Sequence, residues 1–389
     1  AKLKKLGCRF VTGRYFGGDL GPEETAGQFQ AMIVAIGLGS ARNLGIAGEK
    51  NPRVLDGVEW LRHLSLGKVD SIKGVVAVIG GGNTAMDCAR SALRLGARPV
   101  ILYRRTKAQM PALAEEIEEA REEGVGFEFL VTPSAIKERS GGDLELTLGQ
   151  MKLGEPDASG RASPVPIEGA FKTMNVSYVI KALGETLDIS GLAQPTLAGG
   201  YLSATGPFPA TSGLIFACGD CTGKTSTAAE AIRAGREMAL KVSALLGAEK
   251  EPVTNLMRLR GVNAEVAKFK QFNKSYFSIA PRPAGKILAS ESRKMHFNEM
   301  VGGLAEHEAL GEALRCFQCG TCNLCGNCEL FCPDRAIVLD ADGVRYKVNY
   351  DYCKGCAVCV EECPRAAIHI RLRTEGEEGH KIEKGKNGL

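Results

Sequence analysis

Ten of the 14 cysteines lie between Cys316 and Cys363, and eight of these ten form two runs with identical spacing. Each cysteine of the first run has a counterpart 31 residues later, and a proline follows the last cysteine of both runs. Thiolates spaced as C-x2-C-x2-C-x3-C-P bind [4Fe-4S] clusters, and the fourth cysteine of each run binds the cluster of the other run. The spacing therefore predicts two clusters, one on Cys322, Cys325, Cys328 and Cys363 and one on Cys353, Cys356, Cys359 and Cys332.

Zinc is the alternative occupant of these cysteines. A zinc site needs only four thiolates in CxxC pairs and has no use for the x3-C-P endings, so we expect iron-sulfur clusters. Cys316 and Cys319 continue the CxxC rhythm upstream and exceed what two clusters need. They are candidates for an alternative register, a redox pair, or a remnant without a role. Ten cysteines within a short stretch at the end of a long chain indicate metal binding rather than a disulfide scaffold. Because disulfides are rare in the cytoplasm, this use of cysteine predicts a cytoplasmic protein.

A glycine-rich turn follows the apolar run 74–80 and opens a predicted helix. Its GxGxxA spacing is typical of a turn that brings the pyrophosphate of a dinucleotide against backbone N–H groups at a helix N-terminus. The next apolar run, 99–105, ends in Arg104 and Arg105, where NAD-binding folds carry an acid for the ribose 2′-hydroxyl. Because guanidinium groups pair with phosphate, we predict NADP(H), with NAD(H) as the other candidate. A plain glycine turn with two solvated arginines is the alternative. The turn residues are Gly80, Gly81, Gly82, Asn83, Thr84 and Ala85.

The elements around this turn must hold it in place. Short, nearly uninterrupted apolar runs separated by helical segments predict βαβ units and a parallel sheet buried on both faces. The acidic segment 111–124 predicts a second helix over this sheet, because a proline stands near its start and a glycine at its end. The predicted strands are 31–37, 74–80, 99–105, 125–131, 176–184 and 213–220.

Composition narrows the function classes. The chain has 389 residues, 44% of them apolar, and a net charge of +4, which fits two or three folded domains. This balance excludes a disordered chain and a dedicated nucleic-acid or membrane-surface binder. No apolar run approaches the about 18 residues of a membrane span, and the basic start lacks the apolar stretch of a signal peptide. We therefore expect a soluble protein with neither nucleic acid nor a membrane as partner.

The series of motifs resembles the pyridine nucleotide oxidoreductase flavoproteins, in particular the glutamate synthase small-subunit branch, over about residues 1–245. The resemblance implies a bound FAD. In that family a Gly-Asp pair at a strand end contacts the ribityl or pyrophosphate part of FAD. The following helix directs its N-terminus at the flavin ring, where the helix dipole stabilises negative charge. Carried over, these contacts fall on Gly219 and Asp220 and on Ser226, Thr227 and Ala228, with Gly37 and Gly184 as turn glycines after two further strands. An ordinary strand-to-helix turn is the alternative for Gly219 and Asp220.

The sequence departs from this family near its start. Family members begin with a GxGxxG of their own for the ADP end of FAD, whereas only a short segment precedes residue 31 here, and Ile36 stands where threonine is usual. The chain would then be a fragment, or a partner subunit would supply this half, or the flavin would be held incompletely. Cys218 and Cys221 also form a CxxC, like the cysteine pair of thiol-disulfide reductases in the superfamily. Disulfide reduction is therefore a less favoured alternative function.

We predict an α/β fold with Rossmann-like NAD(P)- and FAD-binding domains and a small α+β domain like bacterial ferredoxins. The predicted function is an NAD(P)H-dependent oxidoreductase that passes electrons from NADPH through FAD and two [4Fe-4S] clusters to ferredoxin or a partner subunit, in either direction. An electron-wiring subunit of a larger complex, without catalysis of its own, is the alternative. No residue is predicted as a catalytic acid or base, because none of the five histidines lies in a motif. The expected divisions are 1–50 with 176–248 for FAD, 51–175 for NAD(P), 249–312 as a connector, 313–373 for the clusters and 374–389 as a mobile tail.

Overall fold

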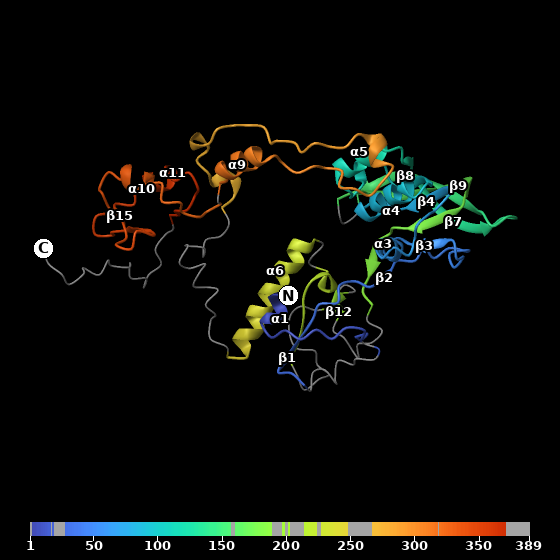
Figure 1. Ribbon diagram of the computed structural model, residues 1–389, viewed down its shortest axis with the longest axis horizontal. Coiled ribbons are helices and arrows are strands. Elements are labelled where there is room, and N and C mark those ends of the chain that lie inside the picture. Colours follow the sequence, from blue (N-terminus) through green and yellow to red (C-terminus); the bar gives the residue numbers. More distant parts are fainter. Residues whose placement is uncertain are drawn as a thin grey trace. The chain divides into compact units, whose positions relative to one another are not determined.

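The computed structural model of the chain, shown in Figure 1, divides into two compact units. The first unit comprises Ala1–Leu246 with Ile287–Gly302, and the second comprises Gly247–Lys286 with Gly303–Leu389. Ser226 and the predicted tail, 374–389, lie outside the residues that the structure describes. The described residues are 2–16, 18, 28–156, 160–188, 197–198, 201–202, 214–223, 227–247, 267–317 and 319–370.

A five-stranded parallel sheet forms the centre of the first unit, with strand order β3-β10-β4-β5-β6. Its middle strand, β4, is buried from Val76 to Ile79, which explains the uninterrupted apolar run in the sequence. Helix α4 contributes fully buried Met86 and Ala89 to the same hydrophobic core. The bounds are β3 Val54–Asp56, β4 Val75–Ile79, β5 Arg98–Tyr103, β6 Gly126–Phe129, β10 Tyr178–Lys181, α3 Gly57–Ser65, α4 Asn83–Arg94, α5 Ala114–Glu122 and the 3-10 turn η1 Lys107–Gln109.

A three-stranded antiparallel sheet, β7-β8-β9, follows β6 along the chain. Leu144, Leu146 and Leu148 alternate along β8 with less buried residues, so one face of this sheet lies in a hydrophobic core. No strand is predicted from the sequence between 132 and 175, because two prolines and a glycine interrupt the apolar pattern of β9. The bounds are β7 Val131–Glu138, β8 Leu144–Pro156 and β9 Ala162–Val176.

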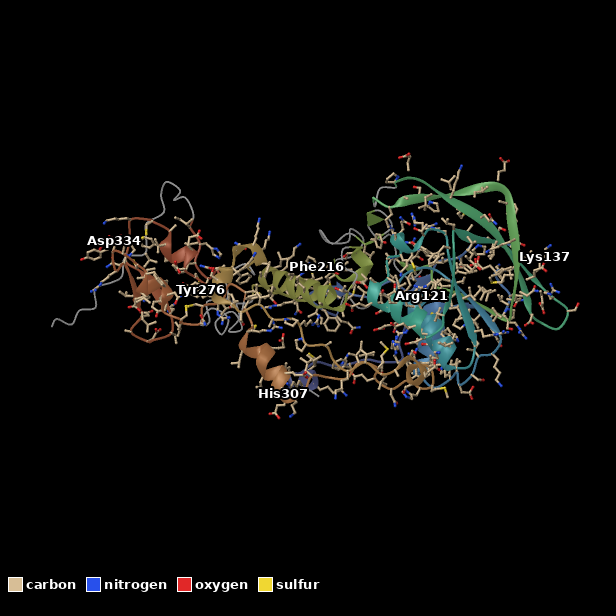
Figure 2. The ribbon with its side chains drawn as sticks, turned by 90° about the horizontal axis from the view of Figure 1, so that it is seen from above. Arg121, Lys137, Phe216, Tyr276, His307 and Asp334 are labelled. Carbon is tan, nitrogen blue, oxygen red and sulfur yellow. The ribbon has the colours of Figure 1, made fainter. Side chains whose placement is uncertain are left out.

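Strands β8 and β9 are longer than β7. β7 pairs with β8 only between Leu144 and Gln150, whereas the pairing of β8 with β9 continues to Pro156 and Ala162. We call the additional part, residues 151–156 with 162–166, the hairpin extension. Figure 2 marks the opposite end of the sheet, where Lys137 lies near the end of β7. The hairpin extension therefore projects past the start of β7, away from Lys137.

The segments expected to bind FAD form small pairs of strands. β1 is parallel to β14, β2 is antiparallel to β11, and β12 is antiparallel to β13. The longest helix among the described residues, α6, follows, and a capping box of Thr227 and Glu230 begins it. The bounds are α1 Lys2–Lys5, β1 Ala31–Val34, β2 Ser40–Ala41, β11 Glu185–Thr186, β12 Leu197–Ala198, β13 Tyr201–Leu202, β14 Leu214–Ala217, η2 Asp220–Thr222 and α6 Ala228–Leu245.

Residues 287–302, which we call the strap, lie within the stretch expected as a connector and pack on α4 and α5 of the first unit. Arg293 of the strap is almost fully buried, and its Nη2 lies 2.6 Å from Glu122 Oε2. In the other direction, Arg94 Nε donates a hydrogen bond of 3.2 Å to the carbonyl oxygen of His296. The single helical turn of the strap is α8, Ser290–Arg293.

A buried ion network underlies the strap. The carboxylate of Glu123, a residue only 1% exposed, lies 2.7 Å from Arg90 Nη2 and 3.1 Å from Arg94 Nη2. Arg293 Nη1 approaches the same carboxylate at 3.8 Å. Because a buried charge is costly unless it is paired, Arg90 and Arg94 compensate the carboxylate of Glu123, and the strap adds Arg293 as a third partner.

The second unit is built from short elements. Helices α10 and α11 each have four residues, and β15 pairs antiparallel with β16. Upstream of them, Phe317 packs against the rings of Phe269, Phe272 and Phe277, with centroids 6.0, 5.0 and 4.5 Å away. The bounds are η3 Phe269–Gln271, η4 Lys274–Tyr276, α9 Glu306–Leu314, α10 Asn327–Leu330, β15 Ile337–Leu339, β16 Tyr346–Val348 and α11 Val358–Glu361. Across the described residues of both units, none of the helices has the length and apolar character that a membrane crossing requires.

Candidate functional site

The predicted nucleotide turn lies between β4 and α4, and close packing explains two of its glycines. A Cβ atom on Gly80, whose φ is +147°, would lie 2.2 Å from the carbonyl oxygen of Ala182. A Cβ atom on Gly81 would lie 2.5 Å from the ring of Tyr103. Gly82 is the N-cap of α4, and a Cβ atom there would meet nothing closer than 4.0 Å. The turn therefore leaves room in front of α4, where phosphate oxygens can reach backbone N–H groups.

A cleft of about 550 Å³ opens at this turn. Four arginines and no carboxylate line it, which suits a ligand that carries several phosphate charges. The arginines are Arg42, Arg104, Arg105 and Arg161. No local motif marks Arg42, which follows β2, or Arg161, which directly precedes β9. Only the folding of distant segments brings these two residues to the cleft.

The six residues of the turn have two different roles. Gly80, Gly81, Gly82 and Thr84 line the cleft. Asn83 and Ala85 do not: Asn83 Oδ1 accepts a hydrogen bond of 3.0 Å from the backbone N–H of Leu113, and Ala85 is fully buried in the core. Asn83 therefore ties the loop before α5 to the start of α4, and both residues position the turn.

Arg104 and Arg105 have different surroundings although they are neighbours. Arg104 is exposed, lines the cleft and makes no hydrogen bond or ion pair to the described residues. Arg105 is only 4% exposed, and its Nε donates a hydrogen bond of 2.7 Å to the carbonyl oxygen of Ala162 in the hairpin extension. The guanidinium of Arg104 is thus available to a ligand, whereas that of Arg105 braces a neighbouring strand.

The predicted flavin contacts gather at strand ends and at one helix start. Gly37 follows β1 and Gly219 follows β14, and these strands are parallel, so both glycines lie at the same edge. They and Gly184 have positive φ and open space where a side chain would stand, which fits a cofactor that approaches the backbone. Among the other predicted contacts, Asp220 begins η2, Thr227 is the N-cap of α6 and Ala228 is its first residue.

Glu185, which no sequence motif marks, follows Gly184 in β11. Its burial, and after that the charges of Asp56 and Asp220, raise the pKa of its carboxyl group above the usual value. The interaction with Asp220 places Glu185 beside the predicted flavin contacts. A carboxyl group in these surroundings exchanges its proton closer to neutral pH than a solvated glutamate does.

The CxxC pair at the end of β14 is buried. Cys218 is 6% exposed and Cys221 is 0% exposed, and neither forms a disulfide. The thiol of Cys221 donates a hydrogen bond of 3.1 Å to the carbonyl oxygen of Cys218. Burial raises the pKa of both thiols, so the nucleophilic thiolate is scarcer than at a solvated cysteine. These surroundings disfavour disulfide reduction at this pair.

The two halves of the cysteine region repeat in their backbone as well as in their sequence. Six residues with positive φ are related by the same 31-residue interval as the cysteines, and four of them are not glycine. Residues other than glycine adopt a positive φ only when their surroundings require it. The repeat of this conformation therefore indicates that the chain bends in the same way in both halves. The pairs are Leu324 with Gly355, Gly326 with Ala357, and Arg335 with Ala366.

Hydrogen bonds to sulfur repeat at the same interval. The backbone N–H of Ala336 donates to Cys332 Sγ and that of Ala367 donates to Cys363 Sγ, both at 3.2 Å. N–H donors to cysteine sulfur are one means by which proteins tune iron-sulfur clusters. The repeat relates Cys322 to Cys353, which favours the register without Cys316.

The cysteines gather in two sets of four. The first set lines a single cavity of about 150 Å³, and burial together with its neighbours raises the pKa of Cys328 to about 11. In the second set, burial and then the charges of the other three members raise the pKa of Cys359. No three His, Cys, Asp or Glu side chains in the described ranges form a site for a single metal ion. Four thiols around one cavity, two of which accept hydrogen bonds from backbone N–H groups, are ligands of the type that an iron-sulfur cluster needs. The sets are Cys322, Cys325, Cys328 and Cys363, and Cys332, Cys353, Cys356 and Cys359.

Cys316 and Cys319 are exposed and lie on either side of Phe317, the centre of the aromatic cluster. The carbonyl oxygen of Cys316 accepts a hydrogen bond of 2.7 Å from Arg365 Nη1. These contacts favour a structural role for the segment, which holds the upstream aromatic residues against the second cysteine run.

The two units match two different families of known proteins. Residues 9–235 match the sequence profile of the pyridine nucleotide-disulphide oxidoreductases. The chain belongs to this family. Residues 346–369 match the 4Fe-4S binding domain. Membership of the oxidoreductase family and the 4Fe-4S match confirm both the resemblance and the fold class predicted from the sequence.

Relatives of this family member include subunits of larger enzymes. It is 35% identical over 328 residues to the beta subunit of NADP(+)-dependent formate dehydrogenase from Moorella thermoacetica, covering 82% of this chain and 46% of that protein. It is 36% identical over 193 residues to the beta subunit of an NADPH-Fe(3+) oxidoreductase from Geobacter sulfurreducens, covering 48% of this chain and 29% of that protein. It is 31% identical over 263 residues to the glutamate synthase [NADPH] small chain of Halomonas elongata, covering 61% and 54%. The chain thus spans less than half the length of the first two relatives.

Among solved structures, the chain is similar to FprA from Mycobacterium tuberculosis in complex with NADPH. The sequences are 19% identical, the TM-score is 0.48, and the similarity covers 61% of this chain and 69% of that one.

Proposed function

We propose that this chain is an NADPH-dependent flavin and iron-sulfur oxidoreductase that carries electrons between NADPH and a redox partner, in either direction. The observation that carries the proposal is the presence, in one chain, of an arginine-lined cleft at a glycine turn and of two four-cysteine sets. The names of the relatives support NADP(H) as the nucleotide and a partner subunit as the redox partner. A free ferredoxin is the other acceptor that we propose.

In this proposal the first unit binds the nucleotide and the flavin. Gly80, Gly81 and Gly82 let the pyrophosphate approach α4, while Arg104 takes the 2′-phosphate. FAD and the clusters, when bound, supply the hydride and single-electron chemistry that no side chain provides. The chain itself orients these groups and needs no catalytic acid or base. The flavin contacts proposed are Gly37, Gly184, Gly219, Asp220, Ser226, Thr227 and Ala228.

In the second unit, we assign each four-cysteine set to one [4Fe-4S] cluster. Each set takes one cysteine from the other run, so neither cluster can be bound by half of the region alone. Both runs are therefore needed for either cluster.

Anaerobic purification of the full chain followed by reduction with NADPH tests the proposal. We expect about eight iron atoms per chain and loss of the cluster absorbance when NADPH is added, with NADH acting less well. A chain that binds FAD and iron but whose clusters NADPH does not reduce would contradict the proposal.

The alternative, an electron-wiring subunit, is favoured by exposed apolar side chains in the flavin-binding part. Ile33 on β1 and Ile232 and Leu240 on α6 are exposed, and a further polypeptide could cover them. This alternative expects bound clusters, an FAD content near zero and no NADPH oxidation by the chain alone. The FAD content of the purified chain therefore separates the two functions.

A further inference from the structure

The hairpin extension ends at the nucleotide cleft. Arg161 stands directly before β9 and lines the cleft. The next residue is Ala162, whose carbonyl oxygen accepts the hydrogen bond of 2.7 Å from Arg105 Nε. Arg161 is therefore held on the side of the cleft where β5 ends, which is the side of Arg104.

Backbone hydrogen bonds attach the other strand of the extension to the same place. The N–H of Leu130 donates to the carbonyl oxygen of Arg105 at 3.2 Å, and the N–H of Met151 donates to the carbonyl oxygen of Leu130 at 2.8 Å. Leu130 has a φ of +57°, which is uncommon for leucine. In this conformation its N–H bonds to Arg105 and its carbonyl oxygen bonds to Met151. Both strands of the extension are thus fixed to Arg105, β8 through Leu130 and β9 through Ala162.

The charge of the cleft favours an anionic ligand. The cleft lining contains four arginines and no carboxylate, and it includes both the glycine turn and Arg104, which follows the end of β5. A dinucleotide that places its pyrophosphate at the glycine turn directs its adenosine ribose toward the end of the next strand. The 2′-phosphate is the anionic group that distinguishes NADP(H) from NAD(H) at that position.

We propose that Arg161 binds the 2′-phosphate of NADP(H) beside Arg104, and that Arg105 is a positioning residue that holds Arg161 there through Ala162. This inference rests on the proposed function, because it names a specificity residue of the same cleft. The second arginine that binds the 2′-phosphate is then a residue more than fifty positions away from the Arg104-Arg105 motif.

Calorimetric titration of the full chain with 2′,5′-ADP and with 5′-AMP tests the role of Arg161, since only 2′,5′-ADP carries the 2′-phosphate. We expect Arg161→Ala and Arg104→Ala each to weaken 2′,5′-ADP binding about tenfold and to leave 5′-AMP binding unchanged. Arg139→Ala is the matched control, because Arg139 is an exposed arginine at the other end of the same sheet and binds Glu145 there.

Each outcome of this titration decides between interpretations. If Arg161→Ala leaves 2′,5′-ADP binding unchanged, or weakens both ligands equally, the inference about Arg161 is wrong and the NADPH proposal stands. If the unmodified chain does not prefer 2′,5′-ADP to 5′-AMP, both the inference and the proposed NADPH specificity are overturned.

A double-mutant cycle tests the positioning role of Arg105. If Arg105 acts through Arg161, the variant Arg105→Ala weakens 2′,5′-ADP binding, and adding Arg161→Ala weakens it no further. Arg105→Lys, whose ammonium can still donate to the carbonyl oxygen of Ala162, should restore most of the affinity. Additive losses in the double variant would mean that Arg105 contacts the phosphate itself and would overturn this role.

Discussion

Cys363 lines the same cavity as Cys328, although the two cysteines come from different halves of the repeat. The charge of Cys363 also contributes to the raised pKa of Cys328, after burial and the charges of Cys322 and Cys325. The two halves of the region therefore depend on each other for a complete set of four thiols.

Paired serine variants test this exchange of cysteines. We expect Cys328→Ser and Cys363→Ser each to remove about half of the bound iron, and the double variant of these two to remove no more, because both belong to one set. The control is Cys328→Ser with Cys359→Ser, which should lose nearly all iron. The measurement is iron per chain together with electron paramagnetic resonance of the reduced protein. Nearly complete loss in Cys328→Ser/Cys363→Ser would refute the assignment.

Removal of iron by an anaerobic chelator should loosen the second unit and leave the first unit intact. Among the described residues of the second unit, the hydrophobic cluster around Phe272 and Ala366 is small, so bound iron-sulfur clusters would supply much of the stability of the unit. Hydrogen exchange should become faster in β15 and β16 and stay slow in β4. Unchanged exchange in β15 and β16 would show that the unit folds without metal.

Alanine at two adjacent glycines should separate folding from nucleotide binding. Gly81→Ala would push against Tyr103, whose hydroxyl is fixed by a hydrogen bond of 2.8 Å to the carbonyl oxygen of Gln109. We expect it to destabilise the first unit by about 1–3 kcal/mol. Gly82→Ala meets no close neighbour and should keep the stability, but its methyl group would occupy the cleft and weaken NADP+ binding. Thermal denaturation and calorimetric titration measure the two effects, and the reverse pattern would contradict this reading of the turn.

Cys218 and Cys221 should be slow to alkylate and dispensable for electron transfer. Both thiols are buried and their pKa values are raised by that burial, so at pH 8 iodoacetamide should modify them far more slowly than the exposed Cys8. The variant Cys221→Ser should leave NADPH-dependent dye reduction unchanged. Rapid labelling, or loss of activity in Cys221→Ser, would restore the disulfide reductase alternative.

What each carboxylate of the ion network under the strap contributes to the free energy of unfolding should depend on its burial more than on its number of contacts. Glu123→Gln leaves Arg90 and Arg94 without their buried carboxylate, and we expect a loss of about 3–5 kcal/mol in the free energy of unfolding. Glu122→Gln is the matched control, because its side chain is 60% exposed, and it should cost less than about 1 kcal/mol. Chemical denaturation of both variants is the measurement, and equal losses would contradict the argument.

The same carboxylate predicts a pH dependence. Burial alone would raise the pKa of Glu123, but hydrogen bonds and charges from Arg90 and Arg94 outweigh it and hold the pKa below its usual value. A carboxyl group whose pKa is lowered on folding contributes its full stability above about pH 4.3 and loses it as the pH falls through the lower folded value. Glu123→Gln should therefore flatten the decline in stability over this acidic range.

The sequence predicts the features that depend on local spacing. A single thiolate spacing predicts both the type of ligand and the exchange of the fourth cysteines, and the assignment of the two clusters stays a prediction. The structure places Cys363 on the cavity that Cys322, Cys325 and Cys328 also line. The strands β4 and β5 are also predictable, because strands buried on both faces must be apolar throughout. β9 escapes prediction, because its prolines and mixed polarity hide a strand whose regularity comes from pairing with β8.

The glycine turn, the central strands and the cysteine repeat follow from the order of residues, since each is defined by neighbours along the chain. Folding is needed to bury Arg105 against Ala162 while Arg104 stays exposed, and to bring Arg161 to the cleft. The packing of residues 287–302 on α4 and α5 and the full burial of Cys221 also arise only in the folded chain. These outcomes depend on contacts between segments far apart in sequence, and burial, which governs the availability of a charge or a thiol, is a property of those contacts.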